Sequence, residues 1–269
     1  MRITLFTCNQ PRHMDLIARL ATVADELHVV QETKTSFPGV TDAIHPAGPV
    51  LADYFARMQE SEQSLFGRLP FTLPNCRVLP LFMGDLSRVP LESFGDALAA
   101  DHFVVFGSSY IKGALAQFLV EHGCINIHMG VSPYYRGSAC NFWALADDKP
   151  ALVGSTIHLL TTGLDSGPIL FHALPEPSVV DGFMLGMLAV RAANVALSEA
   201  LEQRRMSDMP AQEQDRGQQL RYSRSKDFTE QVAGNYLAAL ASPQQIYESV
   251  ATTRANFEFM RPVVVKAPD

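Results

Sequence analysis

Cysteine and positive charge are both scarce in this chain, and each scarcity excludes a class of protein. The four cysteines among 269 residues, Cys8, Cys76, Cys124 and Cys140, include no Cys-x-x-Cys pair. This spacing argues against a structural zinc site and against a disulfide framework, so we expect reduced thiols. Lysine and arginine number 21 against 28 acidic residues, and the formal charge of −7 has the sign that phosphate-rich polymers repel. We therefore expect no partnership with extended nucleic acid.

Long apolar runs are also missing. No uninterrupted run reaches the roughly 18 to 20 apolar residues that a membrane span requires. The N-terminus begins like a strand, at residues 3–7, rather than like a basic and then apolar signal sequence. We expect a cytoplasmic protein with no membrane partner. Hydrophobic residues make up 47% of the chain, which is enough for a sizeable core in one or two domains.

Short apolar runs alternate with stretches of helical periodicity. Strands are expected at residues 3–7, 27–30, 77–81, 103–106, 124–128, 152–160 and 168–173. Helices are expected at residues 11–23, 51–66, 112–122, 141–146 and 180–203, with a looser helical segment at 86–100. Ser108 or Ser109 is a natural N-cap for the helix at 112–122. The alternation predicts an α/β fold with a Rossmann-like, mostly parallel sheet, helices on both faces and a short helical C-terminal tail.

The composition divides the chain into three parts. Residues 1–205 are expected to form the α/β domain, residues 206–225 a polar linker, and residues 226–269 a helical C-terminal extension. Aromatic side chains in the extension, such as Phe228 and Phe257, predict that it packs on the main domain or on a second subunit. The second alternative would make the protein a homodimer.

An amide, an imidazole and a carboxylate form the candidate site. Asn126 and His128 differ by two positions at the end of an expected strand, so their side chains project to the same side. Asp165 lies in a turn flanked by glycines after the next apolar run. Each residue alone is usually a packing or turn residue. Together they suit the stabilisation of a developing oxyanion during proton transfer.

The turn after the first strand has no Gly-x-Gly-x-x-Gly. A dinucleotide site of the usual kind is therefore disfavoured. The turn reads Asn9-Gln10-Pro11-Arg12-His13 instead. Backbone N–H groups at this helix start, with the side chains of Asn9, Arg12 and His13, could hold a substrate phosphate. The alternative is a solvated surface role.

Four motifs follow one another in the sequence: Asn126-Ile127-His128, Ser132-Pro133-x-x-Arg136-Gly137, Gly154-x-Thr156-Ile157-His158 and Asp165-Ser166-Gly167-Pro168. In this order they resemble the formyltransferase family that uses 10-formyltetrahydrofolate. That family includes glycinamide ribonucleotide transformylase, methionyl-tRNA formyltransferase, the sugar N-formyltransferases and formyltetrahydrofolate deformylase. The resemblance covers about residues 103–170, whereas the first hundred residues agree only in architecture.

The resemblance implies that Asn126, His128 and Asp165 are catalytic. A primary amine would attack the formyl carbon, Asn126 and His128 would donate to the resulting oxyanion, and Asp165 would orient the imidazole and raise its pKa. The co-substrate would be 10-formyltetrahydrofolate, and no metal would be needed. The resemblance also implies two folate-binding loops, residues 108–111 and 161–165. Their candidate residues are Ser108, Ser109, Tyr110, Ile111, Gly163 and Leu164.

The acceptor side of the site has several candidates. Arg136 could grip a substrate phosphate, or it could anchor its loop through carbonyl groups, which we slightly favour. Tyr134, Tyr135 and Trp143 could stack on substrate, although Trp143 on an apolar helical face is more often core. His158 could line the same pocket. A metal role for His128 with His158 lacks a third ligand.

Departures from two members of the family narrow the choice of the amine acceptor. The first turn departs from the Gly-rich turn of the glycinamide ribonucleotide enzyme, and the tail offers no alternating strands for the β-barrel domain of the tRNA enzyme. A nucleotide-linked amino sugar is therefore the leading small-molecule acceptor. Two alternatives remain: a formyltetrahydrofolate hydrolase, and a non-catalytic folate-binding or nucleotide-binding protein on the same fold.

Overall fold

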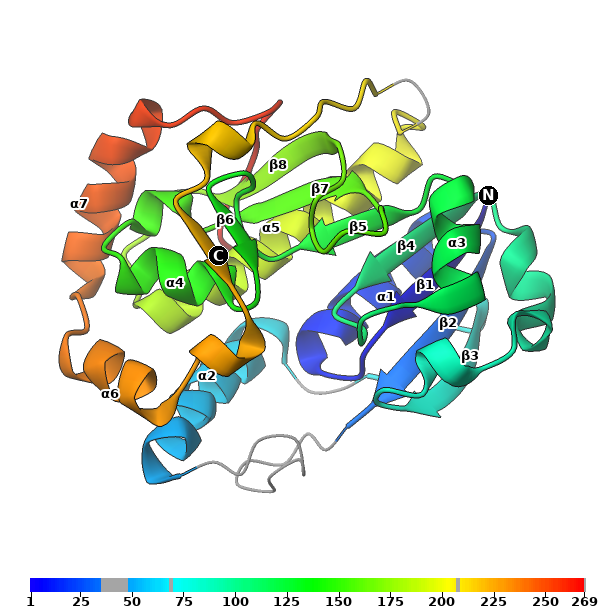
Figure 1. Ribbon diagram of the computed structural model, residues 1–269, viewed down its shortest axis with the longest axis horizontal. Helices are drawn as coiled ribbons and strands as arrows, with labels where there is room; N and C mark the ends of the chain where they lie inside the picture. The colour runs from blue at the N-terminus through cyan, green and yellow to red at the C-terminus, as the bar shows by residue number, and fades with distance from the viewer. Residues whose placement is uncertain (35–47, 68–69, 207–208, 269) are drawn as a thin grey trace.

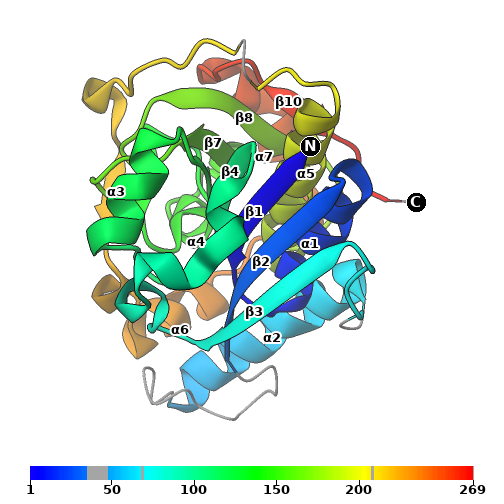
Figure 2. The same cartoon turned by 90° about the vertical axis from the view of Figure 1, so that its right-hand side faces the viewer.

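A central sheet organises the computed structural model, which describes residues 1–34, 48–67, 70–206 and 209–268. Eight strands of the described residues form it in the order β10-β8-β7-β5-β4-β1-β2-β3 (Figures 1 and 2). Only β7 runs antiparallel to its neighbours β5 and β8, and the other strand pairs are parallel. The strands are β1 (Arg2–Thr7), β2 (Glu26–Thr33), β3 (Cys76–Phe82), β4 (His102–Phe106), β5 (Ile125–His128), β7 (Ser155–Leu159), β8 (Ile169–Pro175) and β10 (Val263–Val265). The predicted α/β fold is confirmed.

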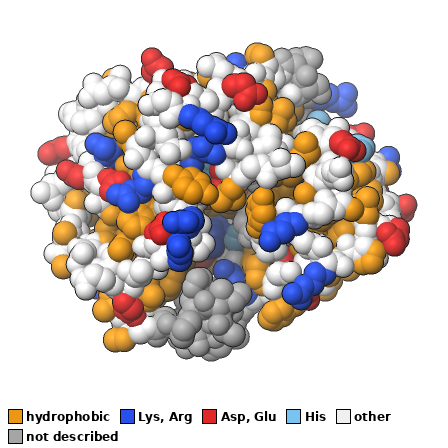
Figure 3. All heavy atoms as spheres, viewed as in Figure 1, with side chains coloured by type: hydrophobic (Ala, Val, Ile, Leu, Met, Phe, Trp, Pro, Cys, Tyr) orange, Lys and Arg blue, Asp and Glu red, His pale blue; other side chains and the backbone are white. Residues whose placement is uncertain are grey.

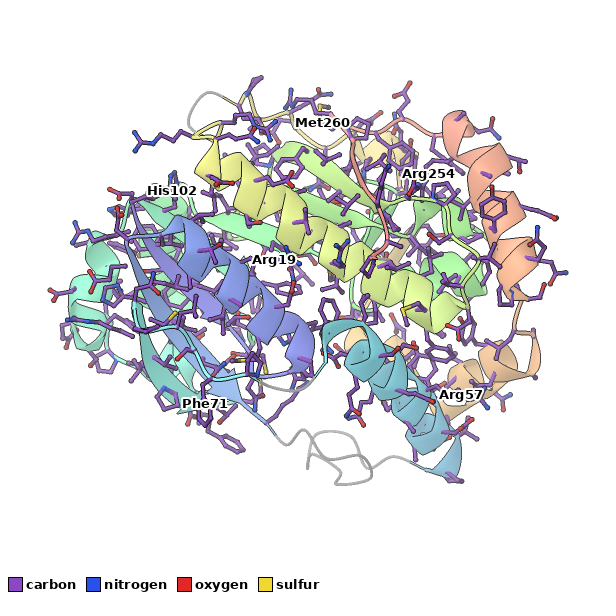
Figure 4. The ribbon with its side chains drawn as sticks, turned by 180° about the vertical axis from the view of Figure 1, so that it is seen from behind. Arg19, Arg57, Phe71, His102, Arg254 and Met260 are labelled. Atoms are coloured by element: carbon purple, nitrogen blue, oxygen red, sulfur yellow. The ribbon has the colours of Figure 1, made fainter. Side chains whose placement is uncertain are left out.

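Helices cover both faces of this sheet, and the central strands are therefore apolar on both sides. On one face, α1 (Pro11–Val23) and α5 (Gly182–Glu202) pack over side chains such as Leu5 and Val104 (Figure 4). On the other face, α3 (Gly113–Glu121) and the 3₁₀ segment η2 (Leu91–Ala99) pack over Phe6 and Val105 (Figure 1). A shorter 3₁₀ segment, η1 (Leu86–Arg88), precedes η2.

The α5 helix is the most apolar long segment of the described structure by average composition, although it contains no uninterrupted apolar run of 18 residues. Among the described helices it alone is long and apolar enough, by length and composition, to cross a membrane. The expectation about membrane spans considered only uninterrupted apolar runs. The small and apolar residues of α5 give a high mean hydropathy over a window of 18 residues, although polar residues interrupt the window. Of that window, 72% is buried inside the structure. The packing of α5 against α1 and the sheet accounts for its composition.

The predicted N-cap of α3, Ser108 or Ser109, is wrong. The helix begins at Gly113, and its N-cap, Lys112, makes no side-chain capping bond. Ser109 instead donates from its backbone N and its Oγ to the buried carboxylate of Glu32, at 2.6 and 2.8 Å. Ser109 therefore bonds a carboxylate 77 residues away in the sequence instead of capping the helix that follows it.

The C-terminal third returns to the main domain at several places. Strand β9 (Arg221–Ser223), inside the predicted linker, pairs with β6 (Tyr135–Gly137), and β10 pairs with β8. None of these three short strands was expected. Helix α6 (Glu230–Ala238) contacts α2 (Pro49–Phe66). The aromatic residues of the extension therefore pack on the main domain, the first of the two predicted alternatives. The three-part division stays a prediction, and residues 207–208 of the linker lie outside the described residues.

The remaining elements lie around the candidate site and the tail. They are α4 (Cys140–Ala146), η3 (Pro150–Leu152), η4 (Arg216–Gln218), η5 (Ser225–Asp227), α7 (Pro243–Thr253) and η6 (Arg254–Asn256). Both α6 and α7 begin with a side-chain N-cap, from Thr229 and Ser242 respectively. These caps satisfy backbone N–H groups that the first helical turn leaves free.

Candidate functional site

The three predicted catalytic side chains meet at the carboxyl end of β5. Asn126 and His128 project from β5 on the same side, and the turn between β7 and β8 brings Asp165 to them. Asn126 Nδ2 lies 3.4 Å from Asp165 Oδ1, and His128 Nδ1 lies 3.4 Å from Asp165 Oδ2. Asp165 adopts a left-handed backbone conformation, with φ at 45°, which aspartate tolerates better than most residues. Segments 39 residues apart in the sequence thus form one polar cluster.

His158 completes this cluster and orients Asn126. Its Nδ1 lies 2.8 Å from the carbonyl oxygen of Leu159, which can only accept, so Nδ1 carries the proton. Burial lowers the pKa of His158 to about 4, and the ring is therefore neutral near pH 7. Its Nε2 then accepts from Asn126 Nδ2 at 2.9 Å. The Leu159 carbonyl thus decides which way the Asn126 amide faces.

His128 and Asp165 form a buried ion pair. Burial on its own lowers the pKa of His128, but the adjacent Asp165 carboxylate outweighs it and the pKa lies well above its ordinary value of 6.5. Burial likewise raises the pKa of Asp165, and the charge of His128 overcomes this and lowers it. His128 is therefore an imidazolium at neutral pH. Its Nε2 lies 3.3 Å from the carbonyl oxygen of Tyr135.

The loop that carries Asp165 is anchored by two residues from elsewhere. Arg136 donates from Nε and Nη2 to the carbonyl oxygens of Asp165 and Leu164, at 3.3 and 3.2 Å. Gln214 Nε2 donates to the carbonyl oxygens of Asp165 and Gly167, at 3.0 and 2.8 Å. Arg136 is buried, and its contacts correspond to the anchoring role rather than to a phosphate grip. Gln214 lies in the predicted linker, where no sequence motif indicated it.

The two loops predicted to hold folate lie against one another. The Tyr110 hydroxyl donates to the carbonyl oxygen of Thr162 at 2.9 Å, which joins the 108–111 loop to the 161–165 loop. Ser109 is held by Glu32, as described above. Tyr110 and Leu164 are both exposed. These two side chains present apolar surface beside the Asp165 cluster.

The residues predicted at the start of α1 make contacts with neighbouring elements, and Arg12 also lines a cavity that His128 lines. The Asn9 side chain donates to the carbonyl oxygen of Lys34 at 2.9 Å and accepts from its N at 3.1 Å. Arg12 donates from its backbone N and Nη1 to the buried carboxylate of Glu62, at 3.0 and 2.8 Å. His13 is buried, and burial lowers its pKa well below 6.5. The Asn9 and Arg12 side chains thus have partners in neighbouring elements, and their role in binding a substrate phosphate stays a prediction.

The predicted stacking residues are likewise buried. The Tyr134 hydroxyl accepts from Glu258 N at 3.0 Å, and the Tyr135 hydroxyl donates to Asp147 Oδ2 at 3.1 Å. Both rings and that of Trp143 are less than 9% exposed. Their contacts secure β6 and the C-terminal extension, so these rings pack inside the protein instead of presenting a face to substrate. Among the described residues, no group of three His, Cys, Asp or Glu side chains is arranged to hold a metal ion.

Sequence comparison finds a known family model that is similar to part of the chain. Residues 91–180 match the family model described as formyl transferase. The methionyl-tRNA formyltransferase of Synechococcus sp. (strain JA-3-3Ab) is 38% identical over 102 residues, which are 37% of this chain and 31% of that protein. That of Desulfotalea psychrophila is 33% identical over 139 residues, 49% of this chain and 42% of that protein. The matches thus span less than half the length of these relatives.

Solved structures share the fold across nearly the whole chain. A 4-N formyltransferase from Francisella tularensis is 15% identical with a TM-score of 0.53, over 100% of this chain and 98% of that chain. An N-formyltransferase from Helicobacter canadensis, in complex with folinic acid and dTDP-3-aminofucose, is 11% identical with a TM-score of 0.52. The match covers 87% of this chain and 79% of that chain. At these identities the likeness extends to the fold alone.

Proposed function

We propose that this chain, which carries a domain of the formyl transferase family over residues 91–180, transfers a formyl group from 10-formyltetrahydrofolate to a primary amine. One observation carries the proposal: Asn126, His128 and Asp165, all inside that domain, converge within hydrogen-bonding or ion-pairing distance. An amide donor, an imidazolium and a carboxylate are the groups that acyl transfer to an amine requires.

The proposed reaction is a direct transfer. The neutral amine attacks the formyl carbon, a new C–N bond forms, and the formyl oxygen becomes negative. Asn126 and His128 donate to that oxygen, which stabilises the tetrahedral carbon. The bond from this carbon to N10 of the folate then breaks, one proton leaves the attacking amine, and one proton joins N10. Asp165 keeps His128 protonated and oriented throughout.

Two weak contacts support this use of the donors. The second Asn126 N–H faces Asp165 Oδ1 at 3.4 Å, and His128 Nε2 faces the Tyr135 carbonyl oxygen at 3.3 Å. Both distances are long for hydrogen bonds, so an oxyanion can replace either partner at little cost. The stronger contacts of His158 with Asn126 and with Leu159 hold the amide during the exchange.

The proposed folate site lies between the loops at residues 108–111 and 161–165. The Tyr110–Thr162 bond holds these loops together next to Asp165. The Helicobacter canadensis relative of the same fold was solved with folinic acid, which supports a folate as the donor. The backbone groups of both loops, with Gly163 and Leu164, would bind the pterin ring.

The proposed acceptor is a nucleotide-linked amino sugar. The complex of the Helicobacter canadensis protein with dTDP-3-aminofucose supports this class. Methionyl-tRNA is the second candidate, because the curated relatives similar in sequence are methionyl-tRNA formyltransferases. The acidic net charge of −7 favours the small molecule over the nucleic acid.

An amine panel tests the function. The protein is incubated with 10-formyltetrahydrofolate and, separately, nucleotide-linked amino sugars, methionyl-tRNA, glycinamide ribonucleotide and amino-acid amides. Tetrahydrofolate together with a formylated amine supports transfer, and the best acceptor names the class. Tetrahydrofolate with free formate would show hydrolysis instead, and no turnover with any amine would indicate a folate-binding protein. Either result would overturn the proposal.

A further inference from the structure

The segment at residues 212–219 lies outside the part of the chain that matches the family model, yet it is fixed beside the turn that carries Asp165. Its backbone pairs with the start of β8. Ile169 N donates to the Gln212 carbonyl oxygen at 2.7 Å, and Gln212 N donates to the Ile169 carbonyl oxygen at 2.9 Å. Figure 1 shows this segment, in yellow and gold, along the upper edge of the molecule beside β8. Because Ile169 begins the strand that leaves the Asp165 turn, this pairing fixes the segment next to that turn.

The Gln214 side chain of this segment bonds both ends of the turn. Its Nε2 donates to the carbonyl oxygens of Asp165 and Gly167, at 3.0 and 2.8 Å. Both partners can only accept, so the amide must direct its NH₂ group toward them. The other amide atom, Gln214 Oε1, is buried and has no partner among the described residues. A buried acceptor without a donor is unfavourable and uncommon in native proteins. The amide therefore leaves one atom unpaired while it holds the turn.

Gln214 is the inward-facing member of a surface segment. Its neighbours Glu213 and Asp215 are both exposed. Figure 3, in the same view as Figure 1, shows acidic side chains along this upper edge. The hydrophobic core is made of other residues. A substitution of Gln214 therefore changes the bonds of the turn and leaves the core in place.

A second side chain of the segment reaches the same turn through Arg136. Gln219 Oε1 accepts from Arg136 Nη1 at 3.2 Å, and Arg136 in turn donates to the carbonyl oxygens of Leu164 and Asp165. The backbone of Asp165 has a φ of 45°, a conformation that few residues other than glycine adopt. Such a conformation persists where the surrounding bonds impose it. The bonds from Gln214 and Arg136 to this backbone supply that constraint.

We infer that Gln214 is a positioning residue, which fixes the backbone of the turn so that the Asp165 carboxylate faces His128. The inference rests on the proposed formyl transfer, in which Asp165 keeps His128 protonated. It adds to that reaction a residue of the C-terminal third that touches neither substrate. Asp165 Oδ2 lies 3.4 Å from His128 Nδ1, and their attraction weakens as this distance grows. A turn freed from Gln214 can rotate and move the carboxylate away from the imidazolium.

The protonation of His128 reports this distance. The titratable groups around it are Asp165 in the turn, Cys140 in α4, His158 in β7 and His172 in β8. His158 and His172 are neutral near pH 7, since burial lowers the pKa of each to about 4. Burial lowers the pKa of His128 as well, and the Asp165 carboxylate outweighs this and raises it. A displaced carboxylate should therefore lower the pKa of His128.

The test is an NMR titration of His128 in the full chain, with isotope-labelled histidine ring nitrogens and the signal assigned by its loss in His128→Ala. Gln214→Met keeps the length of the side chain and removes the donor, and Gln214→Ala removes both. In each we expect a His128 pKa between that of the wild type and that of Asp165→Asn, where the carboxylate charge is absent. With the best amine, kcat should fall about ten- to a hundredfold, the scale of a misplaced catalytic group.

Gln212→Ala is the matched control. The Gln212 side chain is exposed, and its contact with Ile169 is made by the backbone, which the substitution keeps. The pKa of His128 and kcat should both stay at wild-type values in this variant.

The outcomes separate positioning from general support and from the chemistry. A His128 pKa equal to that of the wild type in a folded Gln214 variant overturns the inference, and so does an equal shift in Gln212→Ala. If Gln214→Ala does not fold, Gln214→Met decides in the same way. If neither folds, Gln214 is a structural support and the inference falls. The titration needs no turnover, so absence of any formylated amine with the wild type would overturn formyl transfer and leave the titration to decide on Gln214.

Discussion

The residue that carries most of the proposed chemistry is His128. Its positive charge is kept by Asp165 although burial opposes it. We expect His128→Ala to lower kcat at least about a hundredfold, the scale expected for loss of a positioned donor or acid, and to leave folate binding nearly intact. Turnover with the best amine and a folate titration measure the two quantities. Near-normal turnover would remove the proposed mechanism.

The pH dependence of kcat tests the same residue without removing it. Because the pKa of His128 lies well above 6.5, we expect kcat to fall only as the pH rises through that raised value. Asp165→Asn removes the charge that raises the pKa and leaves the burial that lowers it. The alkaline limb of the profile should therefore move to lower pH in this variant. If the alkaline limb of the profile stays at the same pH in Asp165→Asn, it reports the titration of a group other than His128.

At the scale of elements, the end of β2 holds two loops through one buried carboxylate. Glu32 is fully buried and accepts from Gly84 N at 2.8 Å and from both the N and the Oγ of Ser109. In Glu32→Gln an amide NH₂ replaces one acceptor and faces these donors. We expect a loss of about 1–3 kcal/mol in the free energy of unfolding and a higher KM for the formyl donor, with a smaller change in kcat.

The exposed Glu92 of η2 supplies the matched control for this prediction. Glu92→Gln removes the same charge without a buried contact, so urea unfolding and the donor KM should both stay at wild-type values. If Glu32→Gln changed kcat and left the donor KM unaltered, Glu32 would not position the folate loop.

Across the whole molecule, buried histidines make the fold sensitive to acid. Burial lowers the pKa of His158 and of His172 to about 4, and it lowers that of His13 well below the ordinary value of 6.5. His172 donates from Nε2 to the Ser132 carbonyl at 2.8 Å and accepts on Nδ1 from the backbone N of Met260, labelled in Figure 4, also at 2.8 Å. The neutral ring thus joins β8 to the C-terminal extension.

These shifts define the direction and the pH window of the acid effect. Between pH 6.5 and 4 the unfolded chain binds more protons than the folded one, so the free energy of unfolding falls as the pH falls. His158 and His172 each contribute up to about 3 kcal/mol. His128 acts in the opposite sense, since its stabilisation is present below pH 6.5 and lost as the pH rises through its raised pKa.

Urea unfolding at a series of pH values measures this effect. We expect His172→Gln to flatten part of the acid slope. His122→Gln, which changes an exposed histidine, should leave the slope unchanged. An acid slope that is the same in all three proteins would contradict the assignment to buried histidines.

The sequence by itself determined the type and order of most elements and the chemistry of the cluster at Asn126, His128 and Asp165. Helical and strand periodicity are local, so the α/β alternation follows from the order of apolar and polar residues alone. Because side chains alternate along a strand, the spacing of Asn126 and His128 is enough to put both on one side. The turn after the next apolar run then supplies the carboxylate.

Only the tertiary structure decided which remaining polar residues face the site. Asn9 and Arg12 contact Lys34 and Glu62, His13 became buried, and the buried Tyr134 and Tyr135 bond Glu258 and Asp147 through their hydroxyls. The anchoring of Asp165 by Gln214 and the return of the C-terminal strands are likewise long-range contacts. Such pairings depend on how elements pack, and packing has no local signature in the chain.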